Sequence, residues 1–368
     1  MSPASKMTSQ PIQQDLHEAL LYERQTDRSV VCTACKMYCR IKPDRIGICG
    51  VRVNKGGKLY SLVYGKASAV HIDPVEKKPL YHFLPGSEIF SLGTVGCNFG
   101  CSFCQNWNIS QVTRDLRKKL AKEKRFGDIE LEMTGFGYAL PPDRIVEICK
   151  GKKLPAIAYT YNEPVIFFDY LFDTARLAHS EGIRSVFVSN GYESVEAMEL
   201  MHPYLAAMNI DLKSFSDMFY TRLCKAKLQP VLDTISYVHA LGIWLEITTL
   251  VIPGQNDSDE ELNQIAEFIA SVDTNIPWHV SAFYPGYQMK DTKPTPAATL
   301  SRAYDIGKRN GIKYMYTGNI VDDKRSCTYC PGCGKTLVRR SGYRTEITAS
   351  FRNGMCTNCK EKITGVWN

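Results

Sequence analysis

The sequence contains no run of 18 consecutive apolar residues, which excludes a conventional membrane-spanning helix. Residues 1–15, MSPASKMTSQPIQQD, place no apolar stretch behind their charge, so we expect no secretory signal and a cytoplasmic location. No internal repeat or low-complexity segment stands out. What is left is a globular composition, with 44% apolar and 23% charged residues.

Cysteine, by contrast, is abundant. The 368 residues include 14 cysteines, most of which gather in groups of the C-x-x-C type. Without an export signal, such groups indicate metal binding rather than disulfides. The formal net charge of +7 is spread over a long chain, so it is compatible with nucleic-acid binding and equally with docking of an acidic electron donor.

The chain divides by composition into three units. Residues 1–86 form an N-terminal cysteine-containing β unit, in which we predict a short amphipathic helix over 14–25 and short strands over 50–72. Residues 87–320 form the core. Residues 321–368 form a cysteine-rich tail with little apolar content, which needs a metal to fold.

Seven apolar runs in the core alternate with helical patterns. Strands that are continuously apolar are buried on both faces, as in parallel βα units. We therefore predict an α/β fold, a partial or full parallel (β/α) barrel. The seven expected strands are EIFSLGTV, PAIAYTY, SVFVSN, AAMNIDL, IWLEITTLV, WHVSAFY and IKYMYTG.

The first expected strand runs into a loop with three cysteines, Cys97, Cys101 and Cys104, in GCNFGCSFCQNW. A structural zinc site wants four ligands, usually supplied as two pairs. A [4Fe–4S] cluster held by three thiolates instead leaves one iron open to a ligand that is not protein. Barrel active sites lie at strand C-termini, which favours such a cluster over a zinc site that borrows a distant ligand.

The spacing C-x3-C-x2-C, with Phe103 before the last cysteine, resembles the signature of the radical S-adenosylmethionine (SAM) superfamily. The resemblance implies that SAM chelates the open iron through its amino and carboxylate groups. Glu163, in YTYNEP, matches the glutamate of the family's Gly-Gly-Glu-Pro motif, which accepts hydrogen bonds from the SAM ammonium. Tyr161 and Asn162 stand where that motif has glycines. A carboxylate in the first turn of a helix is the alternative for Glu163.

Further candidates for SAM binding lie where the third, fourth and fifth strands end. The polar residues after the third and fourth strands are placed to hydrogen-bond the ribose hydroxyls, and a lysine after the fourth strand could pair with the SAM carboxylate. The segment after the fifth strand is similar to the one that contacts adenine in the family. No catalytic side chain can be assigned. The ribose candidates are Ser189, Asn190 and Asp211, the carboxylate candidate is Lys213, and the adenine candidates are Ile252 and Gly254.

Two further cysteine groups flank the core. The tail carries two C-x2-C pairs that indicate a structural zinc ribbon, with a rubredoxin-like iron site as the alternative and Cys327 as a further ligand candidate. The N-terminal group, with 2, 3 and 9 intervening residues, can close either a zinc knuckle or a second, fully ligated iron–sulfur cluster. The tail ligands are Cys330, Cys333, Cys356 and Cys359; the N-terminal ligands are Cys32, Cys35, Cys39 and Cys49.

Two features stay outside these sites. Cys149 and Cys224 fall in helical patterns, where we expect buried packing residues. Residues 114–125, RDLRKKLAKEKR, are strongly basic and predict a solvated helix face, with docking of an acidic partner or RNA as the alternative.

The chain carries the motifs GICGVR, EKKPLYHFLPG, GTVGCNF, CQNW, AYTYNEP, NIDLKSF and YTGN. On these motifs, the chain taken whole resembles the radical SAM member of the AmmeMemoRadiSam group, and its barrel is similar to the pyruvate formate-lyase activating enzymes. The resemblance implies reductive cleavage of SAM to a 5′-deoxyadenosyl radical, which abstracts hydrogen from a protein, peptide or small-molecule substrate. It implies a low-potential electron donor of ferredoxin or flavodoxin type, and AMMECR-type and Memo-type proteins as partners. The basic segment 114–138 departs from the group's usual connection.

Two rival hypotheses stay open on the sequence. One is an RNA-modifying radical SAM enzyme, which would bind RNA through the basic segment. The other is a non-catalytic zinc or nucleic-acid-binding module, which would contain zinc only and bind RNA in a salt-dependent manner.

Overall fold

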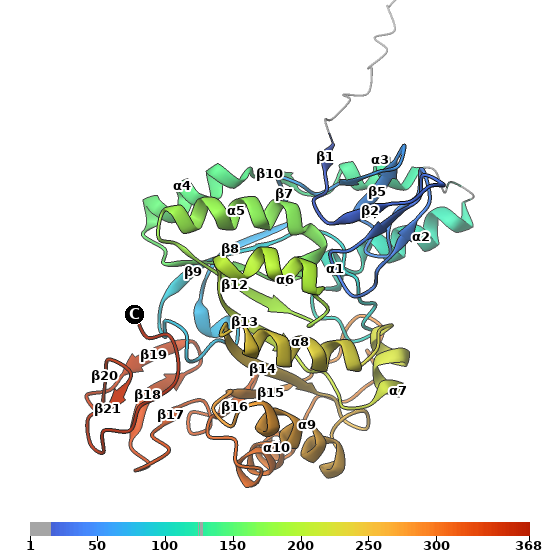
Figure 1. Ribbon diagram of the computed structural model, residues 1–368. Coiled ribbons are helices and arrows are strands. Elements are labelled where there is room, and N and C mark those ends of the chain that lie inside the picture. Colours follow the sequence, from blue (N-terminus) through green and yellow to red (C-terminus); the bar gives the residue numbers. More distant parts are fainter. Residues whose placement is uncertain (1–15, 124, 126–127) are drawn as a thin grey trace, which may run out of the picture.

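The computed structural model describes residues 16–123, 125 and 128–368. Its centre is an eight-stranded sheet in the order β16-β15-β14-β13-β12-β11-β9-β8, in which the edge strand β8 runs antiparallel to β9 and the other neighbours are parallel (Figure 1). The strands are β8 (Ala69–Pro74), β9 (Glu88–Gly93), β11 (Ala156–Tyr159), β12 (Arg184–Ser189), β13 (Leu205–Asp211), β14 (Trp244–Val251), β15 (Trp278–Ala282) and β16 (Met315–Gly318).

The parallel strands are the seven predicted from continuous apolar runs, which confirms the α/β fold with a parallel sheet. Every residue of β11 and of β15 is buried, as expected for strands covered on both faces. Strand β8 was not among the seven, because its side chains are only partly buried. It adds an antiparallel edge to the sheet.

The helices that follow the strands pack on the outside of the sheet (Figure 1). Ser258 caps one of them by accepting a hydrogen bond from the Glu261 backbone N–H at 3.2 Å, and the acidic residues of the first turn favour this helix N-terminus. These helices are α4 (Pro142–Lys152), α5 (Phe168–Ser180), α6 (Val195–Met201), α8 (Gln229–Ala240), α9 (Asp259–Val272) and α10 (Ala297–Arg309); the short turns are η1 (Val75–Lys77), η3 (Pro164–Phe167), η4 (His202–Tyr204), α7 (Asp217–Phe219) and the π-helical η5 (Tyr220–Cys224).

The N-terminal unit is built from short antiparallel strands, and the helix predicted over 14–25 is wrong for its described part. Residues 17–18 and 22–24 pair with β6 and β3 instead. The Leu20 N–H donates to Asp169 Oδ1 at 2.7 Å, so tertiary partners outcompete a helix too short to be stable alone. The strands are β1 (His17–Glu18), β2 (Tyr22–Arg24), β3 (Val30–Cys32), β4 (Arg40–Ile41), β5 (Arg52–Lys55), β6 (Lys58–Ser61) and β7 (Lys66–Ala67). Strand β10 (Tyr138–Ala139), from outside this unit, pairs with β7.

The basic segment forms α2 (Val112–Lys122), between α1 (Trp107–Ser110) and α3 (Ile129–Thr134). Lys118 and Lys119 are exposed, as predicted for a solvated face. Arg114 and Arg117 instead turn toward the cysteine loops, where Arg114 Nη2 donates to the Asn98 carbonyl at 3.0 Å and Arg117 donates to the Gly47 carbonyl. Part of the basic charge therefore holds loops together. No helix in the described part of the chain is both long and apolar enough to cross a bilayer.

A buried polar network forms the floor of the sheet, at the end of the strands opposite to the three-cysteine loop. The Glu246 carboxylate accepts hydrogen bonds from the backbone N–H groups of Tyr81 and His82 at 2.9 and 2.7 Å and contacts His279 Nε2 at 2.6 Å. Burial alone would raise the pKa of Glu246, but the partners, His279 first among them, hold it below its usual value. The network holds the Tyr81–His82 segment against β14 and β15.

The tail docks on the same floor through backbone hydrogen bonds between Val366 and the 82–84 segment and through a buried arginine. Its strands are β17 (Thr328–Tyr329), β18 (Thr336–Ser341), β19 (Arg344–Ile347), β20 (Phe351–Arg352) and β21 (Met355–Cys356). Arg340 of β18 is fully buried and pairs with the buried Glu76 at 3.6 Å. Its guanidinium also donates to the Tyr81 carbonyl at 2.7 Å and to Thr328 Oγ1 at 2.9 Å.

Replacing Arg340 with leucine is expected to lower the free energy of unfolding by about 3–5 kcal/mol, because it leaves the Glu76 carboxylate buried without its cation. Urea-induced unfolding of the metal-loaded protein measures this. Arg340→Lys is the matched control, since it keeps the charge and should lose less stability than the leucine variant. Equal losses in the two variants would show that the hydrogen bonds, and not the ion pair, carry the contact.

Candidate functional site

A cavity of about 560 Å³ opens at the C-terminal ends of the parallel strands. Residues from β9 to β15, or from the loops that follow these strands, line it, so it lies where βα folds place their active sites. The lining includes all three cysteines of the 97–104 loop together with Glu163, Ser189, Asn190, Asp211 and Lys213. The structure thus brings together eight of the residues predicted from the sequence.

The cysteine loop is held by backbone hydrogen bonds to neighbouring segments. The Gly100 and Ser102 N–H groups donate to the carbonyls of Cys224 and Leu223, at 2.8 and 2.9 Å. The η5 turn therefore fixes the middle of the loop. Cys97 and Cys101 are buried, and Cys104 is partly exposed toward the cavity.

The three thiols differ in their tendency to ionise. Burial raises the pKa of Cys97 well above its usual value, and burial together with the Cys101 charge raises that of Cys104 to about 11. Cys101 goes the other way, because a hydrogen bond from Cys224 and the Lys213 charge lower its pKa. Buried thiols of this kind become thiolates when a metal replaces their protons, so the donor set fits a thiolate-bound metal.

Glu163 lies at the centre of a donor cradle. Its carboxylate accepts hydrogen bonds from Ser189 Oγ at 3.1 Å, from the Asn190 N–H at 2.8 Å and from the Val165 N–H at 3.3 Å. Burial and the nearby Glu193 carboxylate raise its pKa well above the ordinary value. Glu163 is the N-cap of the short turn η3 and is not a residue of its first turn, where the alternative interpretation would place it.

Tyr161 and Asn162, which stand in place of two glycines, each have a local role. Tyr161 adopts φ = +71°, a conformation that costs a non-glycine residue about 1–2 kcal/mol. Its hydroxyl donates to Asp73 Oδ2 at 2.7 Å. Asn162 Nδ2 donates to the Gly96 carbonyl at 2.9 Å, so its amide holds the start of the cysteine loop.

The remaining predicted residues differ in where they lie. Asn190 Nδ2 donates to Asn98 Oδ1 at 2.8 Å and lies 3.9 Å from Cys97 Sγ, which places this amide beside the cysteine loop. Lys213 Nζ pairs with Asp211 at 2.6 Å. Burial alone would lower the pKa of Lys213, but the Asp211 charge raises it well above its usual value.

Ile252 and Gly254 do not line this cavity. Ile252 is fully buried, and the Gly254 N–H donates to Asp257 Oδ1 at 2.7 Å in the turn beyond β14. Thr248 and Leu250 of β14 line the cavity in their place.

The model of the radical SAM superfamily matches residues 91–269, which include the cysteine loop and the ends of β9 to β14. The chain belongs to the radical SAM superfamily. An uncharacterized protein of Methanocaldococcus jannaschii is 38% identical to it over 351 residues, which are 95% of this chain and 99% of that protein. The pyruvate formate-lyase 1-activating enzyme of Escherichia coli is 21% identical over 248 residues, 60% of this chain and 89% of that enzyme. The solved structure of Streptococcus suis SuiB bound to its precursor peptide SuiA is 15% identical, with a TM-score of 0.47 over 67% of this chain and 51% of that chain.

This radical SAM protein has cavity residues that sequence reasoning missed. His71, Asp73 and Lys78 reach the cavity from β8 and the turn after it. Lys78 is buried and pairs with Asp73 at 2.9 Å; burial would raise the pKa of Asp73, but Lys78 and its other partners lower it. His71 and Asp73 are two residues apart in a strand, so both lie on one face of it. This spacing was the sequence signal that could have identified them as cavity residues.

The tail cysteines of the radical SAM protein form the tightest group. Cys330, Cys333, Cys356 and Cys359 bring their sulfur atoms within 4.8 Å of one another, with Cys330–Cys359 and Cys333–Cys356 distances of 3.4 and 3.6 Å. Four thiolates at Zn–S distances of about 2.3 Å need such spacing, so the group fits the predicted zinc ribbon. Cys327 lies outside the group, and its thiol donates to the Asp323 carbonyl at 3.0 Å.

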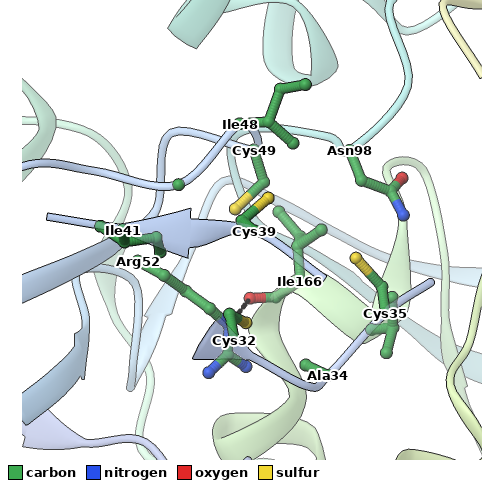
Figure 2. Close-up of a pocket in the computed structure, with 12 residues that line it drawn as sticks. Cys32, Ala34, Cys35, Cys39, Ile41, Ile48, Cys49, Arg52, Asn98 and Ile166 are labelled. Atoms are coloured by element: carbon green, nitrogen blue, oxygen red, sulfur yellow. Dashed lines mark hydrogen bonds between the residues drawn. The ribbon is translucent and has the colours of Figure 1, made fainter. Parts of the chain in front are cut away.

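The N-terminal cysteines line a second, smaller pocket next to the cysteine loop (Figure 2). Cys32, Cys35 and Cys49 are buried, and Cys39 is partly exposed. Cys149 and Cys224 are fully buried in α4 and η5, as expected for packing residues, and Cys224 also contacts Cys101.

Proposed function

We propose that this protein holds a [4Fe–4S] cluster on Cys97, Cys101 and Cys104 and uses it to cleave SAM reductively. The product is a 5′-deoxyadenosyl radical that abstracts hydrogen from a protein, peptide or small-molecule substrate. The observation that carries the proposal is the convergence of the three thiols, Glu163 and the Asp211–Lys213 pair on one cavity at the strand ends. Superfamily membership supports the same cofactors.

The side chains around the cavity divide the work of binding SAM. Glu163 would accept hydrogen bonds from the ammonium group. Among the described residues its buried carboxylate has hydrogen-bond donors but no cationic partner, which agrees with its raised pKa. Lys213, held by Asp211, would pair with the carboxylate of SAM. When bound, the cluster and SAM supply the one-electron chemistry, and the protein positions them and excludes water.

The substrate enters from the side of β8 and the tail. Lys77, Lys78 and Tyr343 line the cavity there, with Lys77 Nζ 5.3 Å from the Tyr343 ring centre. Lys77 and Lys78 share one carboxylate, that of Asp73, so this part of the lining keeps a net positive charge, which favours a substrate group with negative charge. We propose a protein or peptide substrate, with glycyl-radical installation or an AMMECR-type or Memo-type partner as the specific candidates, and a ferredoxin or flavodoxin as electron donor.

The reconstituted protein should release 5′-deoxyadenosine and methionine when SAM and dithionite are added under anaerobic conditions, as measured by liquid chromatography. Omitting dithionite should prevent release, because cleavage of the sulfonium needs an electron. No 5′-deoxyadenosine from a protein with full cluster occupancy would refute the proposal.

A further inference from the structure

We propose that Cys32, Cys35, Cys39 and Cys49 hold a second iron–sulfur cluster, which passes electrons to the cluster of the 97–104 loop. The first half of this proposal concerns these four cysteines alone. The second half, the electron relay, rests on the function proposed above.

The spacing of the four thiols favours a cluster over a single zinc ion. In the part of the chain that the structure describes, only the tail cysteines bring three or more ligand atoms within 4.8 Å of one another. The N-terminal thiols are therefore spread more widely than one tetrahedral ion allows. They surround a cavity of about 20 Å³, whereas a zinc ion bound at about 2.3 Å by four sulfurs leaves no free space between them. In this respect they resemble the three cysteines of the 97–104 loop.

A buried amide N–H group without an acceptor is directed at the same pocket. Asn98 is fully buried and lines the pocket, and its Nδ2 donates to no group of the protein. Figure 2 shows this amide turned toward the cysteine sulfurs. A buried N–H without an acceptor destabilises the folded chain, and sulfur atoms of a bound cluster would accept its hydrogen bond.

The charge of the pocket is balanced by a buried arginine. Arg52 lines the pocket, is 1% exposed and pairs with Asp169 at 3.0 Å, while its Nη1 has no hydrogen-bond partner. Four thiolates around a metal centre carry net negative charge, and a cation beside them lowers the cost of burying it. Cys39, the one partly exposed ligand, marks the side from which an electron can enter.

The pocket adjoins the cysteine loop directly. Asn98 follows Cys97 in the chain, and the Cys97 thiol lies 3.7 Å from Asn98 Oδ1. A Cβ at Gly96 would lie 2.6 Å from the Cys49 carbonyl oxygen, so the two loops are in contact there. On the other side, Cys35 bridges to Glu193 in the loop that carries Asn190. Asn98, which follows Cys97 and lines the pocket, and the Asn190 amide hydrogen-bonded to it therefore connect the two sets of thiols.

The relay balances as a one-electron transfer. A low-potential protein donor of the iron–sulfur or flavin class loses one electron to the N-terminal cluster, which passes it to the second cluster. The electron ends in the sulfonium of SAM, where the bond from sulfur to the 5′ carbon breaks to give methionine and the radical. The relay itself moves no proton.

The test compares the anaerobically reconstituted full chain with a Cys97→Ala, Cys101→Ala, Cys104→Ala triple variant. Iron should fall from about eight to about four per chain and labile sulfide likewise, with the zinc of the tail unchanged. The reduced triple variant should still give an electron paramagnetic resonance signal, and adding Cys35→Ala should remove it. Cys149→Ala, a buried cysteine outside both sites, should keep about eight iron atoms.

Zinc without iron in the triple variant would overturn the cluster, whether or not the wild type cleaves SAM. Should the triple variant fail to fold, the wild type gives the same answer, since SAM should alter the signal of one cluster and leave that of the other unchanged. The relay predicts spin–spin broadening in the fully reduced wild type, lost in both the triple variant and Cys35→Ala. Two independent, unbroadened signals would overturn the relay. An active enzyme with about four iron atoms and two zinc atoms would refute this inference while leaving the proposed function intact.

Discussion

Replacing Cys101 with alanine is expected to abolish release of 5′-deoxyadenosine. Loss of one ligand should exceed the effect of removing an outer partner of a metal ligand, which costs about 10–100-fold. Cys101 is buried, and the neighbouring thiol of Cys224 belongs to η5 and not to the loop that carries the other two ligands. Iron analysis and product release, measured on the same sample, check the prediction.

The control for this variant is Cys224→Ala. It removes the hydrogen bond that lowers the pKa of Cys101 and keeps all three ligands. Its iron content should match that of the wild type, although loading should need a higher pH because the Cys101 thiol then ionises less easily. Wild-type activity in the Cys101→Ala protein would show that the metal is held elsewhere.

Replacing Glu163 with glutamine is expected to weaken SAM binding by about 30- to 5000-fold, which corresponds to about 2–5 kcal/mol for the loss of one partner of a buried charge pair. The amide keeps the shape of the carboxylate and one acceptor for the Asn190 N–H, but it carries no charge to offer an ammonium group. Anaerobic calorimetry of the cluster-loaded protein with SAM, without reductant, measures the affinity.

The same substitution should change the pH dependence. Burial raises the pKa of Glu163 in the free protein, and an ammonium ligand binds only the ionised form, so wild-type affinity should rise with pH until that pKa is passed. In Glu163→Gln the contribution of this group disappears. Stability behaves in the opposite way: with a raised folded-state pKa, Glu163 lowers the stability of the free protein as pH rises above the ordinary glutamate value, so the glutamine variant should be more stable there.

Glu193→Gln separates the effect on the pH dependence of SAM binding from the effect on its affinity. The Glu193 carboxylate is the neighbouring charge that helps to raise the pKa of Glu163, so its removal should move the affinity profile to lower pH and preserve tight binding at high pH. A loss of affinity as large as that of Glu163→Gln, at every pH, would contradict the assignment of Glu163 as the ammonium partner.

Sequence reasoning reached the parallel strands and most of the cavity because both depend on local patterns. Continuously apolar runs such as that of β15 are buried on both faces. A polar residue that directly follows such a strand therefore lies at the C-terminal end of the sheet, where βα folds form their active sites. The same reasoning failed at residues 16–25, where the partners are β6, β3 and Asp169, all distant in the sequence. It also missed Lys78, since only the fold brings β8 beside β9.

The segments after β14 and around α2 show the second limit. Ile252 matches a family pattern, but the course of the loop beyond β14 decides whether its side chain reaches the cavity. In this structure Ile252 does not line the cavity, whereas Thr248 and Leu250 do. Arg114 and Arg117 look like their solvated neighbours in the sequence, and only the nearby carbonyl groups of Asn98 and Gly47 turn them inward.

The pairing of Glu76 with Arg340 also bears on the order in which the chain matures. Glu76 belongs to the early part of the chain and Arg340 to its last strands, yet each is buried against the other. During synthesis the Glu76 carboxylate cannot pair with Arg340 until the segment that carries this arginine has left the ribosome. This contact can therefore form only after Arg340 has been translated, although domains generally fold from the N-terminus onward as they emerge.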